Sequence, residues 1–521
     1  MSRRSVMKHQ FSEVPQARIP RSSFDRSHGL KTTFDSGYLI PIYVDEALPG
    51  DTFSMNMTGF ARLATPIKPV MDNMFMETFF FAVPYRLLWD NWEKFNGEQQ
   101  NPGDSISFLV PQVAGLATVL DSTIYDYMGI PIGVVGPLSA NSLHFRAYNL
   151  IWNEWFRDQN LQNSVVENTD DGPDAPGDYA LLRRGKRHDY FTSCLPWPQK
   201  GAAVTISPGS SAPVALADTG PSQTIGVMSD WFGEQRGLVP VTSTSVVLAD
   251  PIPAGDAGLY ADLSAAAGTT VNDLRLAFQT QKMLERDARG GTRYTEVIRS
   301  HFGVTSPDAR LQRPEFLGGG SSRINITPVP QTQRSDTPSS TETPQGNLSG
   351  YGTATLNNHG FSKSFTEHCV IIGLANVRAD LTYQQGLNRM WSRQSRLDFY
   401  WPALAHLGEQ EVLNKEIYFS GDANDDLVFG YQERFAEYRY HPSRISGKFR
   451  SGATDSLDVW HLSQDFSALP VLNASFIEDN PPIDRVIAVQ TEPQFLFDAY
   501  FNLRCARPMP LYGVPGFIDR F

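Results

Sequence analysis

The chain has 521 residues, of which 41% are apolar, 41 are glycine and 36 are proline. This composition argues against wholesale disorder, because it can build a large core joined by many turns. Its 44 Lys and Arg face 56 Asp and Glu, for a net charge of −12. A dedicated nucleic-acid binder is usually basic, so any contact with DNA or RNA is local or is aided by a second, basic component. The three cysteines lie far apart and form no disulfide framework or metal motif, as expected in a reducing compartment.

Residues 1–36 are rich in basic side chains and have no periodic apolar face. Three acidic residues oppose seven basic ones, which are Arg3, Arg4, Lys8, Arg18, Arg21, Arg26 and Lys31. We expect an extended arm that becomes ordered only against a partner or a neighbouring segment. The arm is either a basic tail without a role or a segment inside an assembly, near nucleic acid. Arg3, Arg4 and Lys8 are its candidate interior-facing residues.

Three strands are predicted next in the chain. Residues 38–44 are rich in strand-forming side chains, and Pro41 indicates an edge or a bulge. Residues 52–63 alternate between apolar and polar side chains, which is typical of a half-buried strand. Residues 75–83 are apolar on both faces, which suits a central, covered strand. The apolar run 74–83 is too short to span a bilayer, so we expect no membrane insertion.

Residues 141–160 predict a helix, because aromatic side chains recur there at helical spacing and Asn141 or Ser142 can cap its start. The aromatic stripe consists of Phe145, Tyr148, Trp152, Trp155 and Phe156. We interpret the stripe as packing core. A nucleotide-stacking platform is the alternative interpretation.

The segment 181–201 holds the densest basic cluster of the chain, followed by the rigid sequence Leu-Pro-Trp-Pro. The cluster consists of Arg183, Arg184, Lys186, Arg187 and His188. One hypothesis places these side chains on the inner wall of an assembly, beside nucleic acid. The other assigns them to salt bridges between subunits.

Residues 202–270 contain one cation, Arg236, and many turn-forming residues. A segment this long without a clear core pattern predicts a surface insertion that carries a few short strands. Residues 271–302 predict two helical pieces broken at Gly290 and Gly291, and residues 328–350 predict a second polar loop.

The chain returns to predicted strands at 366–374, 415–420 and 427–440. Residues 495–505 alternate cleanly and place Phe495, Phe497 and Phe501 on the core face. Strong strands near both ends can pair with each other, as in an antiparallel Greek-key sandwich. We therefore predict an all-β fold.

No nucleophile elbow, phosphate loop, zinc motif or dinucleotide fingerprint is found in the sequence, so we expect no catalytic site, cofactor or metal. Asp422 to Glu433 resembles the spacing of a calcium loop, but Leu427 occupies the position that requires glycine, and a tight turn is the preferred interpretation. An acidic carbohydrate-binding or carbohydrate-active β-sandwich remains the alternative function.

Many colinear blocks resemble one protein family, the major capsid proteins of gokushovirus-type Microviridae, which are small icosahedral phages with single-stranded DNA. These blocks include residues 33–41 (TFDSGYLIP), 76–86 (METFFFAVPYR), 146–156 (RAYNLIWNEWF), 187–193 (RHDYFTS), 196–201 (PWPQKG), 313–319 (RPEFLGG) and 361–368 (FSKSFTEH). The resemblance covers nearly the whole chain.

The resemblance implies an eight-stranded antiparallel jelly-roll capsid sandwich, with long loop insertions and a few short helices, over residues 37–521. It implies a T=1 shell of sixty copies around circular single-stranded DNA, with 202–270 as the protrusion at the three-fold axes. Implied partners are a small basic DNA-binding phage protein, an internal scaffolding protein and a host surface receptor, with a glycan as one candidate. The protein would reside in the virion, and in the bacterial cytoplasm during assembly.

Overall fold

The computed structural model describes residues 20–116, 119–133, 137–204, 271–305, 312–334 and 343–512, together with the backbone of five short strands between residues 214 and 261. The chain divides into two compact units. The main unit comprises Met1–Pro198 and Gly291–Phe521, and the insertion unit comprises Gln199–Gly290.

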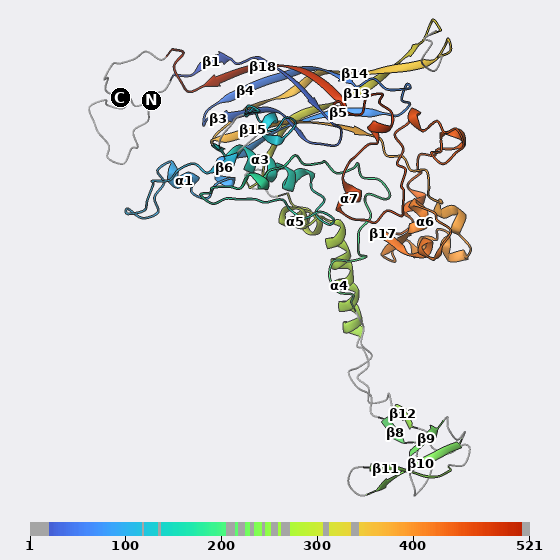
Figure 1. Cartoon of the computed structure of the whole chain (residues 1–521). Helices are drawn as coiled ribbons and strands as arrows, with labels where there is room; N and C mark the ends of the chain where they lie inside the picture. Colours follow the sequence, from blue (N-terminus) through green and yellow to red (C-terminus); the bar gives the residue numbers. More distant parts are fainter. Residues whose placement is uncertain are drawn as a thin grey trace. The chain divides into compact units, whose positions relative to one another are not determined.

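The main unit is built on one curled antiparallel sheet (Figure 1). One half of the sheet runs in the order β1 (Ser22–Asp25) and β2 (His28–Phe34), β18 (Phe495–Arg507), β4 (Thr52–Leu63), β14 (Leu348–Ser364). The other half runs in the order β3 (Ile40–Ala47), β15 (Cys369–Ala379), β5 (Met74–Pro84), β13 (Glu315–Pro330). β13 pairs with both β5 and β14, and it thereby joins the two halves.

The strand order is that of a jelly roll. β1 and β2 pair with successive stretches of β18 and count as one interrupted edge strand. The eight strands then follow the orders 1-8-3-6 and 2-7-4-5, in which the first and last strands are neighbours. The predicted eight-stranded antiparallel jelly roll is confirmed.

The first core lies between the two halves of the sheet. Along β4 and β18 buried and exposed positions alternate, as the sequence pattern predicts. Phe495, Phe497 and Phe501 are buried in this core. Apolar side chains of β3, β5 and β15 meet them from the facing half.

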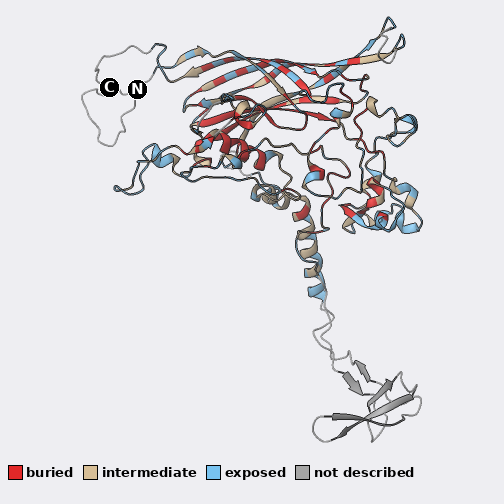
Figure 2. Cartoon of the chain, viewed as in Figure 1, coloured by how far each residue is buried: buried red, intermediate tan, exposed pale blue. Residues whose placement is uncertain are grey.

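A second core lies on the other face of β5 and β15, under helix α3 (Leu143–Ile151). β15 is buried along its whole length, and buried residues gather in the strands and in α3 (Figure 2). Phe145, Tyr148 and Trp152 pack in this second core. The prediction that residues 75–83 form a central strand covered on both faces is confirmed.

The predicted helix over 141–160 ends earlier and changes its pitch. α3 continues into a π-helical turn, η2 (Trp152–Phe156), and the chain is extended at Arg157. A π turn holds more residues than an α turn, so it rotates later side chains away from the line of the stripe. Trp155 is therefore 38% exposed instead of buried in the core.

Three other sequence predictions are corrected. Residues 22–34 belong to the sheet and not to an arm, because their backbone groups pair with the otherwise open edge of β18. The polar loop predicted at 328–350 is shorter, since Pro330 already pairs with Leu348. Residues 415–420 form no strand, because α6 (Asn414–Ile417) makes a helical turn there, and the predicted strand 427–440 is limited to β17 (Val428–Glu433).

The remaining elements of the main unit are short and lie in the two long connections of the jelly roll. Between β5 and β13 these are α1 (Trp92–Phe95), β6 (Gln112–Leu116), α2 (Ile124–Tyr127), β7 (Leu138–Asn141), α3 and α5 (Tyr294–Phe302). Between β15 and β18 these are β16 (Glu409–Leu413), α6, β17 and α7 (Ala474–Ile477). Single 3-10 turns join them.

The insertion unit contains a three-stranded sheet, a two-stranded sheet and one long helix. Its elements are β8 (Val214–Leu216), β9 (Ile225–Ser229), β10 (Glu234–Val241), β11 (Ser245–Pro251), β12 (Leu259–Ala261) and α4 (Val271–Arg289). The two helices predicted over 271–302 are confirmed as α4 and α5. In the described part of the chain, no helix is both long and apolar enough to cross a bilayer.

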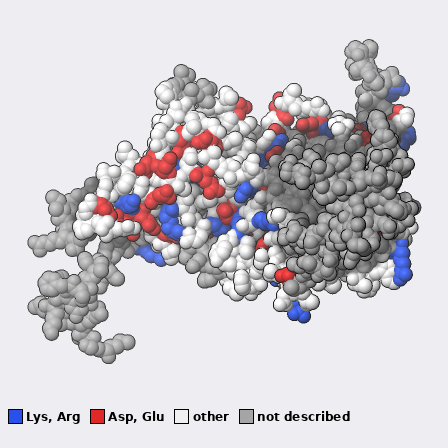
Figure 3. Space-filling view, turned by 90° about the horizontal axis from the view of Figure 1, so that it is seen from below, with Lys and Arg blue, Asp and Glu red and all other residues white. Residues whose placement is uncertain are grey.

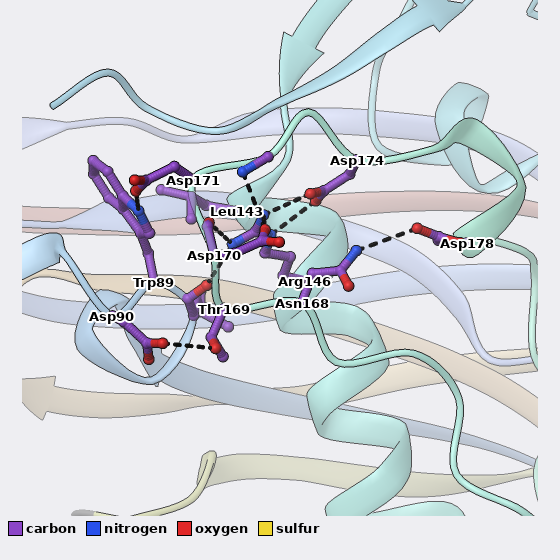
Figure 4. Close-up of polar contacts among 12 residues, drawn as sticks. Trp89, Asp90, Leu143, Arg146, Asn168, Thr169, Asp170, Asp171, Asp174 and Asp178 are labelled. Carbon is purple, nitrogen blue, oxygen red and sulfur yellow. Dashed lines mark hydrogen bonds and ion pairs between the residues drawn. The ribbon is translucent and has the colours of Figure 1, made fainter.

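A buried arginine on α3 fixes the long connection to the second core (Figure 4). The Arg146 side chain is 1% exposed and donates to both carboxylate oxygens of Asp174, at 2.8 and 2.6 Å. Its remaining donors reach the backbone oxygens of Leu88 and Asp170 and the Asp170 carboxylate. All five guanidinium donors are therefore satisfied. This network holds residues 170–174 in place, ahead of the basic cluster.

We predict that Arg146→Met lowers the free energy of unfolding by about 3–5 kcal/mol, because it leaves the buried Asp174 carboxylate without its counter-ion. Urea unfolding of the unassembled protein measures the change. The control is Arg62→Met on the exposed side of β4, which should shift the value by less than about 0.5 kcal/mol. Equal effects of the two substitutions would contradict the role given to Arg146.

Candidate functional site

The basic cluster lies in an extended segment that is held on both sides by backbone hydrogen bonds. On one side, the amide of Leu39 donates to Leu182 and the amide of Arg184 donates to Gly37. On the other side, Asp479 donates to Arg184, and Lys186 donates to Ile477. The alternating backbone of this segment directs neighbouring basic side chains to different surroundings.

A single carboxylate of β5, that of Glu77, holds three arginines together. Strand alternation places Glu77 on the same face of β5 as Phe79 and Phe81. Glu77 forms ion pairs with Arg184, with Arg378 of β15 at 2.7 Å and with Arg187 at 3.4 Å. Burial opposes the charged form of Glu77, but Arg184 and Arg378 outweigh it and lower the pKa of the carboxyl. We name this set the Glu77 centre.

Two of these arginines, Arg184 and Arg187, also have further contacts. Arg187 pairs with Asp380 at 3.0 Å, and its guanidinium lies over the ring of Phe75. Arg184 lies over Phe79 and Phe156. Burial, with a further contribution from the neighbouring positive charge of Arg378, lowers the pKa of Arg184 to about 10.

Lys186 and Asp479 lie behind the Glu77 centre and are both buried. The Lys186 ammonium donates to the carbonyl of Phe476 at 2.6 Å, and burial lowers its pKa. The Asp479 carboxylate has one oxygen that is buried without a hydrogen-bond partner in the structure. Burial raises the pKa of Asp479 to about 7, against the opposing effect of Arg378, Lys186 and Arg184.

An open cleft of about 510 Å³ lies beside the Glu77 centre. Its basic lining includes Arg184, Lys186, Arg187, His188 and Arg378. Its aromatic lining comprises Phe79, Phe81, Trp155, Phe156 and Phe316. Trp155 is fixed at the cleft because its indole donates to the carbonyl of Pro314 at 2.9 Å and Arg313 stacks on its ring.

The structure thus brings together two groups of residues that the sequence analysis singled out separately. Trp155 and Phe156 of the aromatic stripe meet four members of the basic cluster at the cleft. Arg183 lies outside the cleft lining, stacked on Tyr38 and hydrogen-bonded to Asn480. Arg3, Arg4 and Lys8 lie outside the described residues.

Three members of the site were missed by the sequence analysis, namely Glu77, Arg378 and Asp479. Glu77 carried a signal, since it is the one charged residue within an apolar strand. Arg378 and Asp479 carried none, because they reach the cluster from positions about two to three hundred residues away along the chain.

The positive charges of this region exceed its negative charges. Arg183, Arg184, Lys186, Arg187 and Arg378 oppose Glu77 and Asp380, and Asp479 adds a negative charge only above about pH 7. Guanidinium donors beside aromatic faces can bind a planar, anionic group such as a nucleotide. Ion pairs within the chain nevertheless engage Arg184 and Arg187 of the cluster, which neither sequence hypothesis predicted. Contact of the cluster with DNA or with another subunit stays a prediction.

The segment that resembles a calcium loop forms a 3-10 turn, η9 (Ala423–Asp426), capped by the Asp422 side chain. The carboxylate of Asp425 accepts hydrogen bonds from the amides of Ser420 and Gly421. The carboxylates of Asp422 and Asp425 are therefore both bound to backbone amides of the turn. Among the residues that the structure describes, no cluster of three metal-ligating side chains was found.

A jelly roll with two long connections and no catalytic motif in its sequence is the architecture of a viral shell protein. Residues 12–517 match the phage family described as capsid protein (F protein). The chain belongs to this family of capsid proteins, and its role is structural and not enzymatic. As a capsid protein it self-assembles into a shell and is a component of the virion.

The chain is also similar to three curated capsid proteins over almost their whole length. It is 48% identical to capsid protein VP1 of Bdellovibrio phage phiMH2K, with 98% of both chains covered. It is 46% identical to capsid protein VP1 of Chlamydia phage 1, with 98% of both chains covered. Capsid protein VP1 of Spiroplasma virus 4 is 39% identical over 99% of both chains. The resemblance to gokushovirus capsid proteins is confirmed.

We predict that Asp479→Asn removes a pH dependence of stability. The raised pKa of Asp479 means that the folded protein keeps a proton there between about pH 4 and pH 7 that the unfolded chain has already released. The stability contributed by this proton is complete below the unfolded pKa and is lost as the pH rises through the folded pKa. Between about pH 5 and pH 8, the wild type should therefore lose on the order of 2–3 kcal/mol relative to the Asn variant.

Urea unfolding at both pH values measures this difference. The matched control is Asp498→Asn, which removes an exposed carboxylate of β18 and should leave the pH dependence as in the wild type. The same pH dependence in the wild type and in Asp479→Asn would contradict a protonated Asp479.

Proposed function

We propose that sixty copies of this chain assemble into a T=1 icosahedral shell that encloses circular single-stranded DNA. The observation that carries the proposal is the jelly-roll strand order in a chain that matches capsid proteins from end to end. A jelly roll presents short edges and long connections at its surface, and the connections can be shaped for contacts with neighbouring copies without changes to the core. Assembly takes place in the bacterial cytoplasm, and the finished shell is part of the virion.

The charge of the chain indicates which further components the shell requires. At −12 per copy, the shell cannot by itself neutralise the phosphates of packaged DNA. We infer that a small basic DNA-binding phage protein supplies much of the positive charge and that an internal scaffolding protein acts during assembly. The basic arm, with Arg3, Arg4 and Lys8, contributes locally on the inner side. It precedes β1 in the sequence, and β1 pairs with the end of β18.

We propose that the insertion unit is the outward protrusion and contacts a host surface receptor, with a glycan as one candidate. Its division from the main unit as a separate compact body supports this proposal. So does its composition, since residues 202–270 contain a single cation and many turn residues. Such a body can vary without affecting the jelly-roll core.

Replacement of residues 202–270 by a short Gly-Ser linker should leave shell diameter unchanged and remove the surface knobs, as seen by electron microscopy of expressed particles. Binding of these particles to host cells should be lost, because the contacting body is absent. A matched control replaces residues 335–342, in the sequence between β13 and β14, and should keep both knobs and binding. Persistent knobs would contradict the placement of the unit, and undiminished cell binding would contradict its role in attachment.

The combined substitution Arg3→Ala, Arg4→Ala and Lys8→Ala should lower the DNA retained by particles after washing in salt. Each lost phosphate contact on a single strand reduces the slope of log affinity against log salt by about 0.7. The ratio of DNA to protein, measured by absorbance over a salt series, gives the result. Arg62→Ala on β4 is the control for loss of charge. Equal retention by all three proteins would contradict a role of the arm in DNA binding.

A further inference from the structure

Apolar side chains cluster on the surface of the connection between β15 and β18. They are 41% to 71% exposed and comprise Met390, Trp391, Leu397, Phe399, Tyr400, Trp401 and Tyr438. An exposed group of large aromatic residues of this kind marks an interaction site, since monomeric proteins rarely leave one uncovered. We name it the aromatic patch.

The aromatic patch is held in place by arginines of the same chain. Arg393 lies 4.2 Å from the ring of Tyr438 and 5.6 Å from that of Phe399. Arg396 lies 4.4 Å from the ring of Trp401, whose indole donates to the Arg396 carbonyl. A patch ordered before binding loses little conformational entropy when a partner covers it.

The surroundings of the aromatic patch are strongly basic. The segments 389–401 and 434–450 contain eight Lys and Arg against two acidic residues, Asp398 and Glu437. The two segments lie together, because Arg393 pairs with Glu437 at 3.3 Å and the rings of Tyr400 and Tyr438 are adjacent. Aromatic residues and arginine are the types most enriched at protein interfaces.

A surface of opposite charge is formed by the exposed carboxylates of the segment 90–178, which as a whole contains thirteen Asp and Glu against three Lys and Arg. Several of these carboxylates are exposed, including those of Asp90, Glu93, Glu98, Asp121 and Glu167. Figure 3 shows Asp and Glu gathered over one half of the face viewed, on the side where α1 and β6 lie in Figure 1. We name this region the acidic face.

The two surfaces lie at opposite ends of the main unit. In Figure 1, α1 and β6 of the acidic face lie at one end, and α6 and β17, next to the aromatic patch, lie at the other. A patch and its complement at opposite ends of a subunit generate a head-to-tail contact, which closes into a ring when the rotation between copies allows it. A patch that bound itself would bring like charges together instead.

We propose that the aromatic patch of one copy docks on the acidic face of the next copy and forms a head-to-tail contact of the shell. The inference rests on the proposed function as a shell subunit and names the surfaces by which that subunit assembles. The aromatic side chains supply the buried area, and the charges set the orientation and exclude the patch-to-patch arrangement.

Two variants test the contact. The patch variant combines Trp391→Ala and Arg396→Glu, and the acidic-face variant combines Glu93→Lys and Glu98→Lys. Arg504→Glu, an exposed charge reversal on β18 outside both surfaces, is the control. Each variant should fold, because all substituted side chains are at the surface. Circular dichroism melting checks this first. Sedimentation of each protein alone and of the two variants mixed then gives the assembly state.

Each variant alone should stay monomeric, with self-association weakened by about tenfold or more, and the control should assemble as the wild type does. The mixture should form one-to-one heterodimers and no larger particles, because each pair retains a single intact combination of patch and acidic face. A heterodimer can form without a closed shell. Its formation therefore tests the contact between two copies independently of the T=1 geometry. Wild-type particles of another size, with heterodimers present, would overturn the shell proposal but not the contact.

Normal assembly of the acidic-face variant would overturn the inference, since the patch would then have a different partner. Normal assembly of the patch variant together with loss of packaged DNA would also overturn the inference. That outcome would show that Trp391 and its neighbours stack bases of single-stranded DNA. Monomers in the mixture at concentrations where the control assembles would also overturn it.

Discussion

The fold depends on two neighbouring strands, β5 and β15, that are apolar on both faces and must be covered on both. The first core, shared with β4 and β18, covers one face. The other face is covered by α3 and by the connection that contains it. The buried Arg146 side chain holds this connection in place through Asp174. The long connection after β5 is therefore part of the folded core, and only beyond it does the chain leave the main unit to form the insertion unit.

Charge is distributed in a way that suits a protein surrounded by copies of itself. Arg184 and Arg187 of the basic cluster form ion pairs within the chain, on the carboxylates of Glu77 and Asp380. The Lys186 ammonium donates to a backbone carbonyl. Exposed carboxylates gather at the end that carries α1 and β6. Positive charge accompanies the exposed aromatic residues at the other end. Separation of charge along one subunit favours contacts between unlike ends of neighbouring copies over contacts between like ends.

The sequence predicted those elements whose pattern is local. Alternation along β4 and β18, and apolar residues on both faces of β5, were sufficient because burial follows from the strand period. β1 and β2 were missed since an edge strand with polar residues is specified by its partner, here β18. Trp155 was misplaced because a π turn cannot be recognised from helical spacing. The sequence predicted only some members of the Glu77 centre, because its ion pairs join residues about one hundred to three hundred positions apart.

The mass of the assembled particle tests the central claim most directly. Native mass spectrometry of empty particles, expressed with the scaffolding protein and then freed from it, counts the copies without any assumption about their contacts. Sixty copies of the 58.0 kDa chain give about 3.5 MDa, as a closed T=1 shell requires. A single species of that mass is the predicted result. Discrete small oligomers, or a closed particle with a different number of copies, would contradict the account.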